Sequence, residues 1–221
     1  MRNTKLIVKI LEMIAVEHLF ARWQTFVAPF GSDSQSAEAV FAMLVDSYRQ
    51  YFRHYHGIAH LVDCFRYLDE IKQELGQPEL VEYVLWFHDI VCVPGARSNE
   101  TLSAAAAAYA ATELGLTAEF SRQAVRLILL TNHRGGSSSR DGAYLTDIDL
   151  AVLGRDWNGF LDYEHQIRAE YRHLPDAEYR QGRQQVIGQF LQRPSIYRTL
   201  YFRERYEQAA QYNLLKLSEL L

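Results

Sequence analysis

Apolar residues recur every three or four positions along almost the entire chain. This spacing is typical of amphipathic α-helices, which bury one face and expose the other. Alternation of apolar and polar positions, the mark of a half-buried strand, never extends beyond a few residues. We therefore predict an all-α fold. The expected helices run from Leu6 to Pro29, from the N-cap candidates Ser32-Asp33-Ser34 to Tyr48, from His56 to Gly76, from Pro78 to Pro94, across Ala104–Ala108, from Thr117 to about Thr131, and in three or four further segments between Leu145 and Leu221.

One stretch, Arg134–Tyr144, is rich in glycine and serine. Such a composition disfavours helix and indicates a loop. Because the helical pattern resumes immediately afterwards, we interpret this stretch as a mobile loop within one domain, not as a linker between two. The expected domain covers residues 1–221, with N-terminal helices (1–50) packed on a core (51–155) that is followed by C-terminal helices (156–221).

The composition adds limits on location and partners. Of 221 residues, 48% are apolar and 23% are charged, as in an ordinary globular protein. The net charge of -4 argues against nucleic acid or an anionic membrane as the main partner, because both attract basic surfaces. Cys64 and Cys92 lack CxxC spacing and are expected to stay thiols, which suits a reducing cytoplasm. Lys9 and Glu12 interrupt the apolar stretch Leu6–Ala15, which argues against a signal peptide or membrane span there. We expect a cytoplasmic protein.

The first candidate for chemistry is the pair His88-Asp89, at the end of an apolar run. His88 shares a helical stripe with Val81, Val84 and Leu85, so it occupies a position where an apolar residue is expected. Asp89 lies close to the same face, and burial of a carboxylate without a partner is costly. A divalent cation would offset that cost and use the imidazole as a second ligand. The alternative is a hydrogen bond between the two side chains in the core.

His56 and His60 are four residues apart, so a helix would project them from one side on consecutive turns. His60 lies at the margin of an apolar stripe, from which it can reach inward, and His56 lies further toward solvent. The segment 54–60 holds three histidines. It is therefore either a metal-binding segment or a polar start to the helix.

Asp149 lies at the edge of another apolar stripe. Asp147 competes for the same role, because the pattern cannot fix the helix phase to one residue. A third interpretation makes Thr146 a helix N-cap with Asp149 at the N3 position. Two imidazoles and two carboxylates would form a mixed nitrogen and oxygen site. Such a site suits Mn, Fe, Co, Zn or Mg and leaves open positions for water.

The order His60 … His88-Asp89 … Asp149 resembles the HD superfamily of metal-dependent phosphohydrolases, which share the pattern H…HD…D on a helical bundle. The resemblance implies an HD-domain-like helical bundle. It also implies that these four residues bind a divalent metal ion, and that the reaction is hydrolysis of a phosphate ester bond.

Two further details resemble the cyclic-nucleotide phosphodiesterase branch of that superfamily. The segment 55–60 has its YHxxxH pattern, in which the first histidine donates a proton and the second binds metal. By this resemblance His56 is the general acid and His60 a ligand. The His–Asp pair is followed by Pro94-Gly95 and Asn99, and Val93 stands where that branch has a histidine.

The chain is still more similar to a bacterial group described as predicted metal-dependent HD-superfamily phosphohydrolases, over nearly its whole length. This resemblance implies a reaction class and leaves the substrate open, as a nucleotide or another small phosphorylated molecule. The segments that carry it are Tyr55-His56 with His60, Phe87-His88-Asp89, Asn99-Glu100 with Ser103, Thr131 with His133, Asp147-x-Asp149-Leu150, Leu153-Gly154, Ile167-Arg168-x-Glu170-Tyr171, Gly182-Arg183 and Asn213-Leu214.

Four other residues are candidates for the site. His133 is either a ligand of a second metal ion or a cationic residue that interacts with the C-terminal end of the sixth helix. Glu100 either orients the attacking water or supplies negative charge at a helix N-terminus. Arg168 and Arg183 are candidates for binding substrate phosphate, because a guanidinium matches phosphate oxygens; most arginines of this part are expected to pair with neighbouring glutamates.

Two other functions are compatible with the same residues. One is a di-iron oxygenase of the HD type, which would need His133 and a further histidine as ligands. The other is a regulatory module that binds a nucleotide without catalysis. We expect no nucleic-acid or membrane partner. The apolar first helix could form the interface of a homodimer or cap the bundle.

Overall fold

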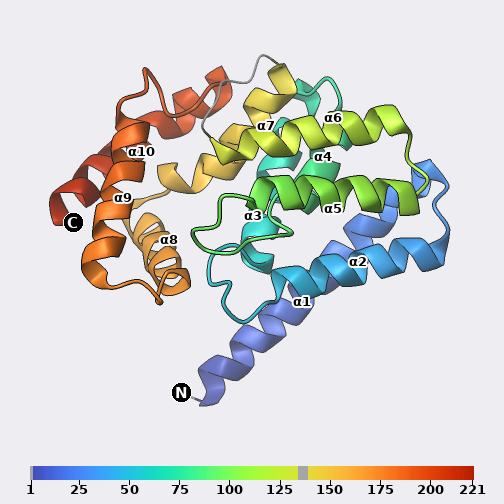
Figure 1. Ribbon diagram of the computed structural model, residues 1–221, viewed down its shortest axis with the longest axis horizontal. Coiled ribbons are helices and arrows are strands. Elements are labelled where there is room, and N and C mark those ends of the chain that lie inside the picture. Colours follow the sequence, from blue (N-terminus) through green and yellow to red (C-terminus); the bar gives the residue numbers. More distant parts are fainter. Residues whose placement is uncertain (1, 134–138) are drawn as a thin grey trace. The chain divides into compact units, whose positions relative to one another are not determined.

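The computed structural model describes residues 2–133 and 139–221 and confirms the all-α prediction (Figure 1). Within those residues there are α- and 3₁₀-helices and no strand. The chain divides into two compact units, Met1–Gly135 and Gly136–Leu221. The assignment of a single domain stays a prediction.

The first unit contains α1 to α6, and its centre is α4. Every residue from Leu80 to Phe87 is buried, because α3, α5 and α6 all pack against α4. The expected stripe is therefore only part of the buried surface: α4 is buried on all sides and is not amphipathic. The elements are α1 (Arg2–Val27), η1 (Ala28–Phe30), α2 (Ser34–Tyr48), α3 (Ile58–Ile71), η2 (Lys72–Glu74), α4 (Pro78–Phe87), α5 (Asn99–Glu113), α6 (Ala118–Ile128) and η3 (Leu129–Asn132).

Trp86 is the centre of the aromatic core around α4. Its ring contacts Trp23 of α1 edge-on at 5.3 Å between centroids, and Phe65 of α3 at 4.5 Å. Burial of aromatic rings in such pairs is a main source of stability. One helical turn before Trp86, Tyr83 donates a hydrogen bond to the carbonyl of Ala107, in the alanine-rich run of α5. The small side chains there let α5 lie close to α4, as expected for a packing face.

The start of α3 differs from the prediction. The helix begins at Ile58, so His56 lies in the turn before it and not on its first turn. The reason is Gly57, the N-cap residue, whose backbone is extended (φ -117°, ψ -162°). An added Cβ at Gly57 would lie 3.2 Å from the carbonyl oxygen of Tyr48, so this position favours glycine. His56 and His60 are consequently separated by a change of chain direction.

The second unit contains the other helices, and η4 packs against α10. Gly154 allows this contact, because a Cβ there would lie 2.5 Å from the Cβ of Tyr206. Asn213 of α10 donates hydrogen bonds to the carbonyls of Leu153 and Arg155. Two segments singled out in the sequence, 153–154 and 213–214, therefore meet in this core. The elements are α7 (Arg140–Leu150), η4 (Ala151–Gly154), α8 (Trp157–Glu170), α9 (Asp176–Leu191) and α10 (Leu200–Leu220).

The expected loop at Arg134–Tyr144 is wrong in its second half. Ser139 caps α7 by accepting a hydrogen bond from the backbone N–H of Gly142, so Arg140 to Tyr144 is helical. Residues 134–138 lie outside the described residues. Thr146 is inside α7, where its hydroxyl donates to the carbonyl of Gly142, and it is therefore not an N-cap.

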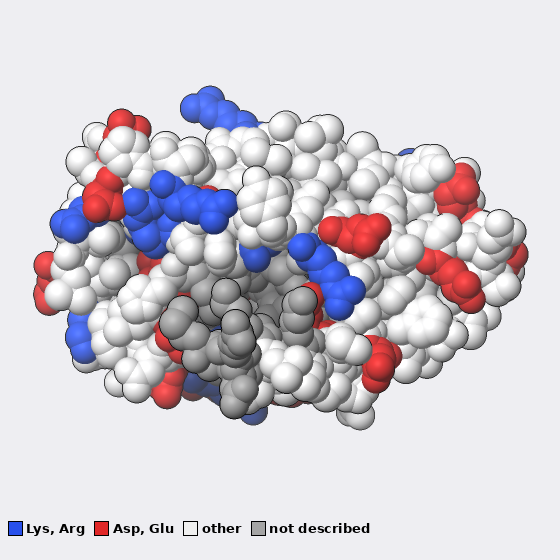
Figure 2. Space-filling view, turned by 90° about the horizontal axis from the view of Figure 1, so that it is seen from below, with Lys and Arg blue, Asp and Glu red and all other residues white. Residues whose placement is uncertain are grey.

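The surface is mixed in charge. Both acidic and basic side chains lie on the face drawn in Figure 2. Among the described residues, none of the helices has both the length and the hydropathy that crossing a bilayer requires.

Candidate metal centre

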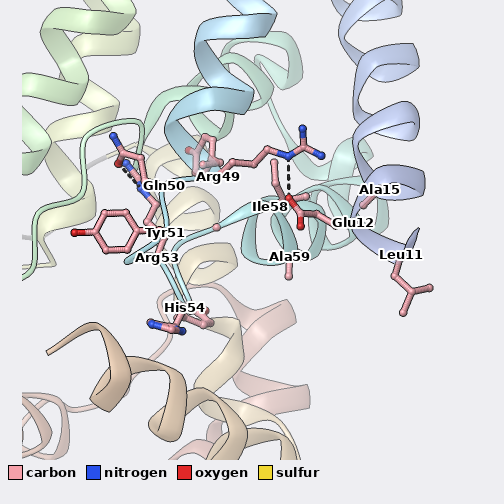
Figure 3. A pocket seen from close by; sticks show the side chains of 13 residues that line it. Leu11, Glu12, Ala15, Arg49, Gln50, Tyr51, Arg53, His54, Ile58 and Ala59 are labelled. Carbon is pink, nitrogen blue, oxygen red and sulfur yellow. Dashed lines mark hydrogen bonds and ion pairs between the residues drawn. The ribbon is translucent and has the colours of Figure 1, made fainter. Parts of the chain in front are cut away.

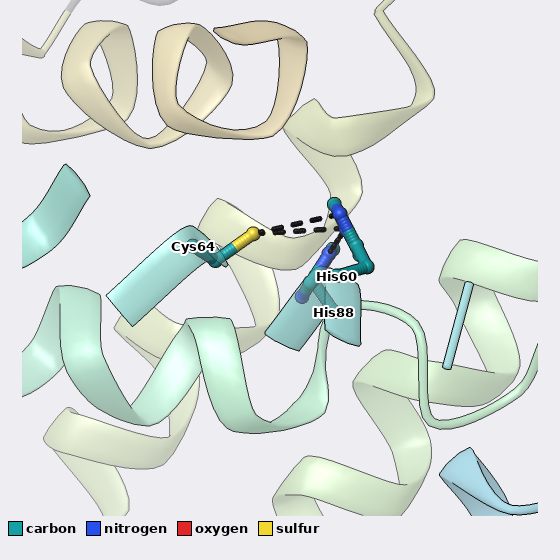
Figure 4. A group of neighbouring side chains, drawn as sticks. All are labelled: His60, Cys64 and His88. Atoms are coloured by element: carbon teal, nitrogen blue, oxygen red, sulfur yellow. Dashed lines mark hydrogen bonds between the residues drawn. The ribbon is translucent and has the colours of Figure 1, made fainter. Parts of the chain in front are cut away.

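Two buried histidines form the centre of the candidate site. His60 lies on the first turn of α3, and His88 follows the last residue of α4, with side chains 3% and 1% exposed. Their Nε2 atoms are 3.1 Å apart (Figure 4). The Nδ1 atom of His88 lies 2.9 Å from the carbonyl oxygen of Leu85. Because a carbonyl oxygen can only accept, this contact requires a proton on Nδ1 of His88, and Nε2 is the ring nitrogen that faces His60.

Asp89 completes a group of three donors in the first unit. Its Oδ2 atom is 3.3 Å from Nε2 of His88 and 3.6 Å from Nε2 of His60. Ligands that share one cation at about 2.1 Å lie about 3.0–3.4 Å from each other in octahedral or tetrahedral geometry. The three atoms are thus spaced closely enough to hold one ion. The Asp89 side chain is 21% exposed, so it is less buried than the sequence pattern suggested.

Arg53 fixes the two segments that carry the site, and the sequence analysis did not single it out. Its guanidinium is buried and donates hydrogen bonds to the carbonyls of His56, Asp89 and Ile90. The turn before α3 is thereby joined to the turn after α4. In the sequence, the one indication of a role for Arg53 is that it lies three residues before His56. Its other hydrogen-bond partners, Asp89 and Ile90, are distant in the chain and could not be recognised from the sequence.

His56 is half-buried and lies beside the histidine pair. The centroid of its ring is 5.9 Å from that of His60, with the planes nearly perpendicular. The buried ring of Tyr55 contacts both, at 4.9 Å from His56 and 4.8 Å from His60. The expectation that His60 is buried and His56 closer to solvent is therefore confirmed, although His56 is not helical.

Tyr48 also lies near the site, and it stays protonated. Burial, and secondarily the charge of Asp89, hold the pKa of Tyr48 well above its usual value. Its hydroxyl donates a hydrogen bond to the carbonyl of Trp86. Tyr48 is thus a neutral neighbour of the carboxylate and is not suited to exchange protons near neutral pH.

The segment between α4 and α5 is held by side chains of α5. Asn99 both accepts from the N–H of Val93 and donates to its carbonyl, and Ser103 accepts from the N–H of Val91. Asn99 and Ser103 therefore have structural roles in this segment. Glu100 is in the first turn of α5, half-buried, a position that suits a helix-stabilising charge; its role toward water stays a prediction.

His133 ends η3, just beyond α6. Its backbone is in the left-handed region (φ 53°), and its N–H bonds to the carbonyl of Leu130. The residue thus terminates this helical segment through its backbone, and the expected interaction of its side chain with the end of the sixth helix stays a prediction. Its role as ligand of a second metal stays a prediction.

In the second unit, the structure distinguishes the two aspartates of α7. Asp147 is fully buried and accepts hydrogen bonds from the backbone N–H groups of Arg198 and Thr199 and from the Thr199 hydroxyl. These bonds hold the N-terminus of α10 and leave Asp147 as a structural residue. Asp149 is half-buried near the end of α7, and its role as a metal ligand stays a prediction from the order of the motif.

The two arginines proposed for phosphate binding have internal partners in the second unit. Arg183 is ion-paired with the buried Glu164, and the pairing was expected for arginines of this region. Burial by itself lowers the pKa of Arg183, but the neighbouring Tyr163 and Glu164 raise it above its usual value. Arg168 donates to the carbonyls of Tyr171 and Leu174. Phosphate binding by either residue stays a prediction.

A cavity of about 480 Å³ lies in the first unit, between α1 and the segment before α3 (Figure 3). It is lined by Arg53, His54 and Tyr55, among others, and an ion pair between Arg49 and Glu12 spans it. The three donor atoms of the candidate site do not line it. We therefore do not assign the substrate to this cavity.

Comparison with protein families, with curated proteins and with solved structures found no match to this chain.

Proposed function

We propose that the protein is a metal-dependent phosphohydrolase, in which His60, His88 and Asp89 bind a divalent cation. The observation that carries the proposal is the convergence of two imidazole nitrogens and one carboxylate oxygen within 3.6 Å of one another. Two of the three side chains, His60 and His88, are almost fully buried. Packing of a helical core alone would be satisfied by apolar residues at these positions. The proposal also draws on the order H…HD…D in the sequence, from which Asp149 is a further predicted ligand.

The donor set fits a divalent cation of the Mn, Fe, Co, Zn or Mg type, because it combines neutral nitrogen with anionic oxygen. Such a cation, when bound, acidifies a coordinated water and neutralises charge on phosphoryl oxygens. The protein's own contribution is to fix the ligands. His88 is oriented by the carbonyl of Leu85, and the backbone of Asp89 is held by Arg53.

His56 is the proposed proton donor to the leaving alkoxide. It is half-buried, so its ring can reach a substrate, and its own carbonyl is fixed by Arg53. A histidine titrates close to neutral pH and can therefore donate a proton there. The substrate class that suits this chemistry is a small phosphate ester, such as a nucleotide.

The proposal is tested with protein from which a chelator has removed metal and which is then reloaded with Mn²⁺, Co²⁺, Zn²⁺ or Mg²⁺. Hydrolysis of p-nitrophenyl phosphate and of bis(p-nitrophenyl) phosphate separates monoesterase from diesterase activity. With Mn²⁺ we expect H88A and D89A to lose both bound metal and hydrolysis. The exposed His18 of α1 supplies a matched control, H18A, which should keep both.

The role of His56 is tested in the same assay. H56A should keep metal and lose turnover by about 10²–10⁴-fold, the usual contribution of a general acid. Loss of metal from H56A combined with full metal in H60A would reverse the two roles. A metal-loaded wild type that hydrolyses neither ester, nor a panel of nucleotides, would contradict the proposed activity.

A further inference from the structure

A buried cysteine lies beside the histidine pair. Cys64 of α3 is one helical turn after His60, and its side chain is 1% exposed. Its Sγ atom is 3.6 Å from Nε2 and 3.9 Å from Nδ1 of His60 (Figure 4). A buried cysteine alone would be an ordinary core residue. What distinguishes Cys64 is that two imidazole nitrogens converge next to it.

Two of the three spacings among these atoms are close to those of a tetrahedral ion with one sulfur ligand. Zn–N bonds of about 2.0–2.1 Å and a Zn–S bond of about 2.3 Å place the two nitrogens about 3.4 Å apart and each nitrogen about 3.6 Å from sulfur. The observed distances are 3.1 Å between the nitrogens of His60 and His88, and 3.6 Å between Nε2 of His60 and Sγ of Cys64. Donor atoms of all three residues lie within 4.8 Å of one another.

The histidine pair therefore has two different neighbours. Asp89 offers a hard oxygen and is partly exposed, whereas Cys64 offers a soft sulfur and is buried. Hard ions such as Mn²⁺ and Mg²⁺ prefer carboxylate, and thiophilic ions such as Zn²⁺ and Cd²⁺ prefer thiolate. The third ligand at this position then depends on the ion.

We infer that Cys64 is a metal ligand for thiophilic ions, so that His60 and His88 serve two alternative donor sets. The inference rests on the proposed metal centre, because it uses the same histidines. Binding forms a metal–sulfur bond and breaks the S–H bond, and the proton is released to solvent. The ion that occupies the protein then determines whether sulfur or carboxylate completes the histidine pair.

The test starts from the full chain after a chelator has removed any bound metal. Cd²⁺ is titrated in while ultraviolet absorption is recorded for the sulfur-to-cadmium charge-transfer band, and equilibrium dialysis measures the amount of Cd²⁺ bound. We expect wild type to show the band. C64S should lose the band and bind Cd²⁺ at least about tenfold more weakly, while its Mn²⁺ affinity changes less than about twofold. The other buried thiol supplies the control, C92S, which should keep the band.

The outcomes separate the two proposals. Binding of Cd²⁺ without the band, or a band that persists in C64S, would overturn the role of Cys64 and leave the metal centre intact. Absence of any Cd²⁺ or Mn²⁺ binding by wild type would overturn both. Circular dichroism checks that each variant is folded. If C64S unfolds, C64A replaces it in the same comparison with wild type, because alanine places no polar group in the core.

Discussion

Replacing Arg53 should loosen the metal centre without touching a ligand. In R53M the side-chain stem stays, but the hydrogen bonds to the carbonyls of His56, Asp89 and Ile90 are lost. Hydrogen bonds from a charged donor contribute about 1.5–3 kcal/mol each. We therefore expect a loss of about 3–5 kcal/mol in the free energy of unfolding, less than the simple sum because the three bonds share one donor group.

The assay is urea denaturation at constant pH, with R66M as the matched control. Arg66 is 49% exposed and pairs with Asp63 and Glu70 on the surface of α3, so its loss should cost less than about 1 kcal/mol. In addition, R53M that is folded should bind Mn²⁺ about 10–100-fold more weakly, as when a group that orients metal ligands is removed. Equal stability of R53M and R66M, or unchanged Mn²⁺ affinity in R53M, would refute this reasoning.

Two predictions concern the second unit. Burial raises the pKa of Asp147, so folded protein holds this proton more tightly than unfolded protein does, and ionisation of Asp147 costs stability as pH rises. The measured quantity is the free energy of unfolding of wild type minus that of D147N, from urea denaturation at several pH values. This difference should be greatest below the usual aspartate pKa of about 3.9 and should fall as pH rises through the higher pKa that Asp147 has in the folded protein. A difference that increases with pH would contradict this. In E164Q the buried Arg183 loses its ionic partner, which should cost about 3–5 kcal/mol and leave hydrolysis by the remaining folded protein unchanged; a stable variant with altered KM for phosphate esters would instead support a role of Arg183 at the substrate.

The hydrophobic pattern was sufficient for the fold class and for most helices. It also placed His88 correctly among buried residues, because helical spacing alone puts it in line with Val84 and Leu85. The burial of α4 on all sides was not predictable, since it depends on which helices surround it. The helical start at Arg140 was missed because Gly142, which looks like a loop residue, donates the capping bond to Ser139.

The candidate ligands could be predicted from the sequence, whereas the residues that hold them in place could not. His60 and the His–Asp pair were found from residue type and spacing, and the structure brings them together. The position of His56 outside the helix depends on the extended backbone of Gly57, which a periodic pattern cannot reveal. The role of Arg53 depends on carbonyl groups 36 and 37 residues away in the chain. Cys64 was assigned as a plain thiol, because sequence spacing did not relate it to His88.

The central claim is that His60, His88 and Asp89 bind one divalent cation. Crystals of the chelated protein soaked in Mn²⁺ and measured at its absorption edge test this most directly. The account predicts an anomalous peak within about 2.5 Å of Nε2 of both histidines and of a carboxylate oxygen of Asp89. Data in which the three side chains are ordered but no peak lies between them, at saturating Mn²⁺, would contradict it.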